Sequence, residues 1–105
     1  MAKIRAKHYL RVKNRFPDYL SAVEALGAAA RKEGPIDEKA AQLIQLAAAA
    51  AIRSEGAVHS HVRRAREAGA KEEEIYHTLI LLTSTIGFPA VSAAISWADD
   101  EIEEG

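Results

Sequence analysis

The chain has 105 residues, of which 49% are hydrophobic and 28% charged, and its formal net charge at pH 7 is −1. This length and composition are typical of one globular domain, and the balanced charge argues against a nucleic-acid-binding protein. The chain contains no cysteine, which excludes disulfides, thiolate nucleophiles and cysteine-based metal sites. The longest apolar stretch, residues 43–52, is too short to span a membrane, and no signal peptide is recognisable. We therefore expect a cytoplasmic protein that binds neither nucleic acid nor membrane.

Proline and glycine divide the first half of the chain into predicted helices. Residues 1–15 are rich in lysine and arginine and form either a basic arm or a short helix that ends before Pro17. Pro17 suits the first position of a second helix, which should stop near Gly34-Pro35. Asp37 is a natural N-cap for a third helix over residues 38–53. Apolar residues occur on almost all sides of this third helix, so we expect it to be buried all round.

The second half predicts three further helices. The first ends at Gly69, the second covers residues 72–86, and the last begins near Pro89. No segment alternates as a β-strand does, so residues 1–105 are predicted to form a single all-α domain of about five to six helices. Two of the helices have more than one apolar face, which is more apolar surface than one small core can hide. We therefore expect the chain to form a homo-oligomer.

Residues 54–69 contain two of the four histidines and carry the strongest functional signal. Read as a helix, this segment places one histidine among small side chains, on the same side as Ser54: Ala57, His61, Ala65 and Ala68. The opposite side repeats every four residues: Glu55, His59 and Arg63. We therefore expect His61 to face inward, towards a pocket, and His59 to face outward.

His61 suits general acid–base catalysis, because the pKa of histidine is close to neutral pH and its small neighbours leave room for a cavity. The alternative is a buried histidine that is hydrogen-bonded to a carbonyl group. Gln42 lies on a helix predicted to be buried, so its amide needs a partner, and His61 or Ser54 could supply one. Glu55 and His59 are either a second catalytic pair, with the imidazole facing a neighbouring subunit, or an exposed ion pair.

A metal site built on both neighbouring histidines is disfavoured. His59 and His61 are two residues apart, so on a helix their side chains point about 200° apart and one ion cannot readily bind both. We therefore expect no metal and no other cofactor.

Four segments together resemble the carboxymuconolactone decarboxylase family, the small all-α proteins with the AhpD-like fold of alkylhydroperoxidases. They are residues 37–44, residues 61–70, Glu73-Glu74-Ile75 and residues 86–90. In the peroxidase branch of this family, two cysteines occupy the positions of Ser54 and Ala57, and a relay glutamate occupies that of Gln42. This chain retains only His61 of that set. The resemblance also implies a trimer or hexamer.

Two functions remain open from the sequence. The decarboxylase branch lacks the cysteine pair and keeps the histidine, so the resemblance implies a lyase-like enzyme that acts on a small carboxylated or lactone substrate. His61, Glu55 and His59 are then the candidate catalytic residues, and Ser54, Gln42 and Ala57 the candidate substrate-binding residues. The alternative is a non-enzymatic oligomeric module that binds a ligand or has a structural role. Thiol peroxidase activity is excluded because a serine hydroxyl neither ionises near neutral pH nor forms a disulfide.

Overall fold

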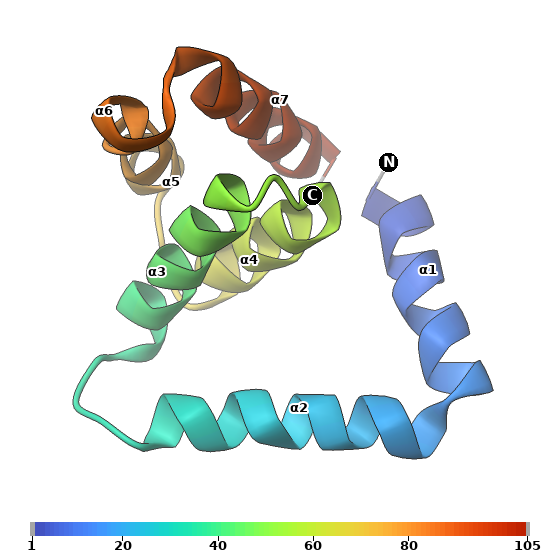
Figure 1. Ribbon diagram of the computed structural model, residues 1–105. Coiled ribbons are helices and arrows are strands. Elements are labelled where there is room, and N and C mark those ends of the chain that lie inside the picture. Colours follow the sequence, from blue (N-terminus) through green and yellow to red (C-terminus); the bar gives the residue numbers. More distant parts are fainter. Residues whose placement is uncertain (1, 105) are drawn as a thin grey trace.

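The computed structural model describes residues 2–104, and the side chains of residues 7–104. Within this range the chain forms seven helices and no strand (Figure 1). They are α1 (Ala2–Arg15), α2 (Pro17–Lys32), α3 (Glu38–Ala51), α4 (Glu55–Glu67), α5 (Glu72–Ile80), α6 (Thr83–Ile86) and α7 (Phe88–Glu104). The all-α prediction is confirmed. None of the helices over residues 2–104 has both the length and the apolar character needed to cross a bilayer.

The core lies where α3, α4, α5 and α7 meet (Figure 1). Its largest apolar side chains are fully buried: Leu46, Val58, Val62, Ile75 and Leu79. The alanines of α4 and α7 that face this core are equally buried: Ala65, Ala94 and Ala98. Side chains this small let the two helix backbones approach closely, so α4 packs directly on α7.

The helix ends follow the local signals in the sequence. Pro17 is at the start of α2, and the Asp37 side chain accepts a hydrogen bond from the backbone N–H of Ala40 at 2.8 Å, which caps α3. Gly69 follows the end of α4 with φ = +97°, a conformation that a side chain disfavours. The predicted N-cap of α3 and the proline start of α2 are therefore confirmed.

The predicted helix over residues 72–86 is wrong in its second half. The chain leaves α5 after Ile80 and forms the separate four-residue helix α6. The hydroxyl of Thr83 donates to the carbonyl oxygen of Ile80 at 2.7 Å. Threonine and serine side chains compete in this way with the helical ladder, and residues 83–85 are Thr-Ser-Thr.

The first two helices lie along the edge of the molecule (Figure 1). Helix α1 extends over Ala2–Arg15, so the basic N-terminal segment forms a helix, one of the two alternatives that the sequence left open. On α2 the only buried side chain is that of Leu20. Three other apolar side chains of α2 are exposed: Tyr19 (64%), Val23 (45%) and Leu26 (72%).

Helix α3 is not buried all round within this chain. Its buried side chains lie on one face: Gln42, Leu46, Ala49 and Ala50. Ile44, and Ile52 immediately after the end of α3, are exposed. The prediction of a helix buried on every side is therefore wrong for the single chain, since these apolar side chains remain exposed in it.

Candidate active site

Ser54 lies immediately before α4 and acts as its N-cap. Its hydroxyl oxygen accepts a hydrogen bond from the backbone N–H of Ala57 at 3.4 Å. His61 lies two turns further along α4, about 10 Å from Ser54 at 1.5 Å of rise per residue. The structure therefore gives Ser54 a role at the start of the helix and does not bring its hydroxyl to the imidazole.

His61 is partly buried, and its ring is tied to Gln42 of α3. Nδ1 of His61 lies 2.8 Å from Oε1 of Gln42, whose side chain is only 1% exposed. This confirms the expectation that His61 partners the buried amide. An amide oxygen can only accept, so Nδ1 carries the hydrogen and Nε2 carries the lone pair. His61 thus presents a basic nitrogen at Nε2.

Two charged residues extend this contact beyond Gln42. Nε2 of Gln42 donates to Oε1 of Glu38 at 2.8 Å, and Oε2 of Glu38 lies 3.5 Å from Nε of Arg31 on α2. Sequence reasoning missed both residues. The i,i+4 spacing of Glu38 and Gln42 could have revealed the first. Arg31 lies on another helix, so no local sequence pattern predicts its contact with Glu38.

Burial lowers the pKa of His61 below its ordinary value of 6.5, and the positive charges of Arg64 and Arg31 lower it further. Removing water from around an imidazolium and placing cations near it both disfavour the charged form. The imidazole is therefore neutral at pH 7 and able to accept a proton.

His59 is the more deeply buried of the two histidines, with 2% of its surface exposed. The expectation that His59 faces outward is therefore wrong within this chain, whereas His61 is partly buried against Gln42. The reason is that His59 lies where α1, α4 and α7 meet. The wall of the cavity beside it includes Tyr9 of α1, and Asp100 of α7 is also close.

Glu55 and His59 do approach each other, as their spacing predicts. Oε2 of Glu55 lies 3.8 Å from Nε2 of His59, which is an ion-pair distance when the imidazole is protonated. Both line a cavity of about 380 Å³, bounded by α1, the start of α2 and α4. Ser60 and Arg63 are in the same wall, and so is His8, which is exposed.

Within the described part of the chain, Glu55, His59 and Asp100 lie close enough together to be candidates for holding a metal ion. One ligand atom from each lies within 4.8 Å of the other two. Nitrogen and oxygen ligands of a tetrahedral Zn²⁺ site are about 3.4 Å apart, given metal–ligand distances near 2.1 Å. The three side chains would therefore have to close around an ion, and Asp100 comes from a helix that sequence reasoning did not connect to this pair.

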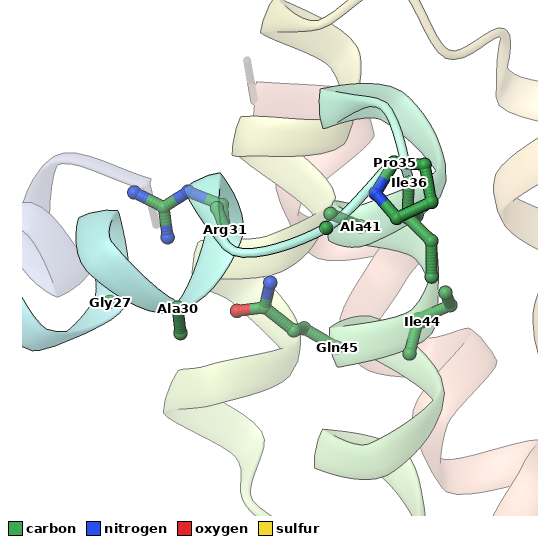
Figure 2. A pocket seen from close by; sticks show the side chains of 9 residues that line it. Gly27, Ala30, Arg31, Pro35, Ile36, Ala41, Ile44 and Gln45 are labelled. Carbon is green, nitrogen blue, oxygen red and sulfur yellow. The ribbon is translucent and has the colours of Figure 1, made fainter.

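A second cavity, of about 360 Å³, lies between α2 and α3 (Figure 2). Its wall is mainly apolar, with Ile44 and Ala41 on α3 and Pro35 and Ile36 in the connecting loop. Its polar side chains are Gln45 and Arg31. Arg31 runs back along α2, so that a Cβ at Gly27 would lie 3.3 Å from its Nη1. The wall of neither cavity includes Ser54, Gln42 or His61.

Comparison with known proteins identifies the family. The sequence model of the carboxymuconolactone decarboxylase family matches residues 17–100. The chain belongs to this family. The fold is also similar to the crystal structure of an apo carboxymuconolactone decarboxylase family protein from Legionella pneumophila, with a TM-score of 0.80 and 26% sequence identity over 98% of this chain and 91% of that chain. A search of curated proteins gave no match.

These comparisons confirm the family resemblance and the AhpD-like fold. The matched region contains α2 to α6 and most of α7, and therefore all of Arg31, Glu38, Gln42 and His61. The hydrogen-bonded histidine thus lies within the part of the chain that defines the carboxymuconolactone decarboxylase family.

Proposed function

We propose that this protein is a cysteine-free, decarboxylase-like enzyme in which His61 transfers a proton on a small carboxylated or lactone substrate. The observation that supports this proposal is the 2.8 Å contact of Nδ1 of His61 with Oε1 of Gln42. It leaves the lone pair of a neutral imidazole at Nε2. Such a ring can take a proton from a substrate and return it from the imidazolium that forms.

The charges near His61 favour an anionic substrate. Arg64 and Arg31 act on the imidazole strongly enough to lower its pKa. The same positive field attracts a carboxylate, and a guanidinium group can bind one through two parallel hydrogen bonds. A bound carboxylate would offset part of this field and raise the proton affinity of His61.

Glu55 and His59 rank behind His61 as catalytic candidates. The two ring nitrogens of His59 are shielded from solvent, so a substrate cannot reach them without movement of a neighbouring helix. Glu55 is exposed at the mouth of the 380 Å³ cavity and is accessible. A role for this pair in the reaction would place the substrate between α1 and α4, on a different side of α4 from Gln42.

The test is a steady-state assay with a panel of lactones and β-keto acids. Replacing His61 by Gln should lower kcat/KM by about 10²- to 10⁴-fold, the usual contribution of a positioned acid–base group. His77→Gln is the matched control, because His77 is an exposed histidine on α5. Turnover that survives in His61→Gln would remove this residue from the mechanism.

A non-enzymatic binding protein is the second candidate function. It is favoured by one observation, that the walls of the two cavities described above are mainly apolar and do not include His61. A ligand that co-purifies with the protein and is not converted would support this alternative. Binding that is unchanged in His61→Gln would separate it from the enzymatic proposal.

We also propose that the chain functions as a homo-oligomer, a trimer or a hexamer as the family resemblance implies. The support is the apolar face of α2, where Tyr19, Val23 and Leu26 are exposed. A helix with one buried side chain and three large exposed apolar ones gains stability by packing on a second copy.

A further inference from the structure

We propose that Glu38 is a positioning residue for His61: its carboxylate orients the Gln42 amide and thereby keeps the basic lone pair on Nε2 of the imidazole. The connection consists of two hydrogen bonds of 2.8 Å each, from Gln42 Nε2 to Glu38 Oε1 and between Gln42 Oε1 and His61 Nδ1. The importance of this arrangement for turnover rests on the proposed function. The arrangement itself does not.

The Gln42 amide has two possible orientations. Turning the amide by 180° exchanges an acceptor oxygen for a donor nitrogen, with little change in shape. An ionised carboxylate can only accept hydrogen bonds, so Glu38 stabilises the orientation in which the nitrogen faces it. The amide oxygen must then face His61. Because Gln42 is buried, water cannot readily replace either partner.

The orientation of the amide determines the tautomer of the imidazole. With the oxygen facing Nδ1, the ring must carry its hydrogen on Nδ1 and leave Nε2 basic. With the nitrogen facing Nδ1, the ring would accept there and carry its hydrogen on Nε2, where it could only donate. Glu38 therefore determines whether Nε2 of His61 is a base.

Glu38 is itself held in place at both carboxylate oxygens. Oε1 accepts from Gln42, and Oε2 is 3.5 Å from Nε of Arg31. Glu38 is also the first residue of α3, where the helix dipole favours a negative charge. These interactions keep the carboxylate oriented although its side chain is half exposed.

The experiment uses ¹⁵N-labelled protein and long-range ¹H–¹⁵N correlation spectra, which distinguish a protonated from an unprotonated ring nitrogen. The His61 signals are assigned by their absence in His61→Gln, and spectra are recorded above the pKa of His61. We expect the wild type to show the Nδ1–H tautomer. Glu38→Gln should shift the tautomer ratio towards Nε2–H by about 3- to 10-fold, because an amide at position 38 can accept or donate.

Glu72→Gln is the matched control. Glu72 is the first residue of α5, is exposed to a similar extent, and faces an arginine, Arg66, at 4.0 Å. It thus reports the effect of removing a first-turn carboxylate with a nearby cation and should leave the His61 tautomer unchanged. A wild-type ring in the Nε2–H form, or a ratio that Glu38→Gln does not alter, would overturn the proposal.

Exchanging the two residues provides a rescue. In the double variant Glu38→Gln/Gln42→Glu, a carboxylate at position 42 accepts directly from Nδ1, so the Nδ1–H tautomer should return. A general loss of structure at α3 would not be rescued in this way. The spectra need no substrate, so a tautomer shift without any detectable turnover would retain the positioning role and reject the proposed function. If turnover is found, kcat should fall in Glu38→Gln while KM changes little.

Discussion

At His61, three influences on the imidazole act in the same direction. Burial and the charges of Arg64 and Arg31 all lower its pKa, so the ring stays neutral under conditions in which a free histidine begins to take up protons. The hydrogen bond to Gln42 also determines which ring nitrogen is basic, because it occupies Nδ1 and leaves the lone pair on Nε2. One residue thus combines a neutral state with a defined tautomer.

This environment predicts an NMR titration of His61 with a midpoint below 6.5, the ordinary value for histidine. The unfolded chain takes up the proton first as the pH falls, because its histidine has the higher pKa. The contribution of His61 to stability is therefore complete above pH 6.5 and is lost as the pH falls towards the lowered pKa. Arg64→Gln should raise the midpoint. A wild-type midpoint at or above 6.5 would contradict the electrostatic account.

At the level of single helices, Gly56 in the first turn of α4 and Gly69 just after its end differ in backbone conformation. Gly69 has φ = +97°, whereas Gly56 lies inside the helix, and a Cβ at either position would meet no atom within 4 Å. Steric contact is therefore absent in both cases, and the backbone conformation alone decides the effect of a side chain.

Gly69→Ala should lower the free energy of unfolding by about 1–2 kcal/mol, because alanine disfavours the left-handed conformation. Gly56→Ala should instead raise it by up to about 1 kcal/mol, because alanine is the better helix former. Urea denaturation of both variants measures the two effects. Equal shifts of the same sign would show that the local backbone conformation does not govern the end of α4.

Most helix boundaries could be predicted from local residues, because proline, glycine and capping aspartate act over a few positions. The break after Ile80 escaped this reasoning, since Ile75 and Leu79 continue an apolar stripe and the hydroxyl of Thr83 overrides it. The exposure of the two histidines escaped it as well. Helical periodicity gives the relative directions of His59 and His61 but not which side the other helices cover.

The candidate site could be predicted only in part. The family resemblance located His61 and Gln42, and their contact was expected. Glu38 was overlooked because the resemblance places its glutamate at position 42, while this chain has its nearest carboxylate one turn earlier on α3. Asp100 and Arg31 reach their partners only through tertiary packing, which no local pattern contains.

At the scale of the whole molecule, α2 leaves most of its large apolar side chains exposed. Leu20 is its one buried residue, and the exposed face that contains Leu26 points away from it around the helix. Among the residues whose side chains are described, none covers this face enough to bury it, which is why we expect a second copy to pack there.

Sedimentation velocity at micromolar concentration should therefore show an oligomer for the wild type. Leu26→Glu should shift the protein to smaller species, because it places a charge in the proposed interface. Ser21→Glu is the control, since Ser21 is exposed on the opposite side of α2. A wild type that sediments as a monomer would contradict the proposed assembly.

Arg31 and the apolar face of α2 belong to the same helix, and this has a thermodynamic consequence. Any event that displaces α2 also displaces a guanidinium group that contacts Glu38 and acts on the imidazole of α4. Linkage is reciprocal, so a binding partner that moves α2 must change the proton affinity of His61 to the same extent that protonation of His61 changes the affinity for that partner. Assembly and proton uptake would then be two readouts of one equilibrium.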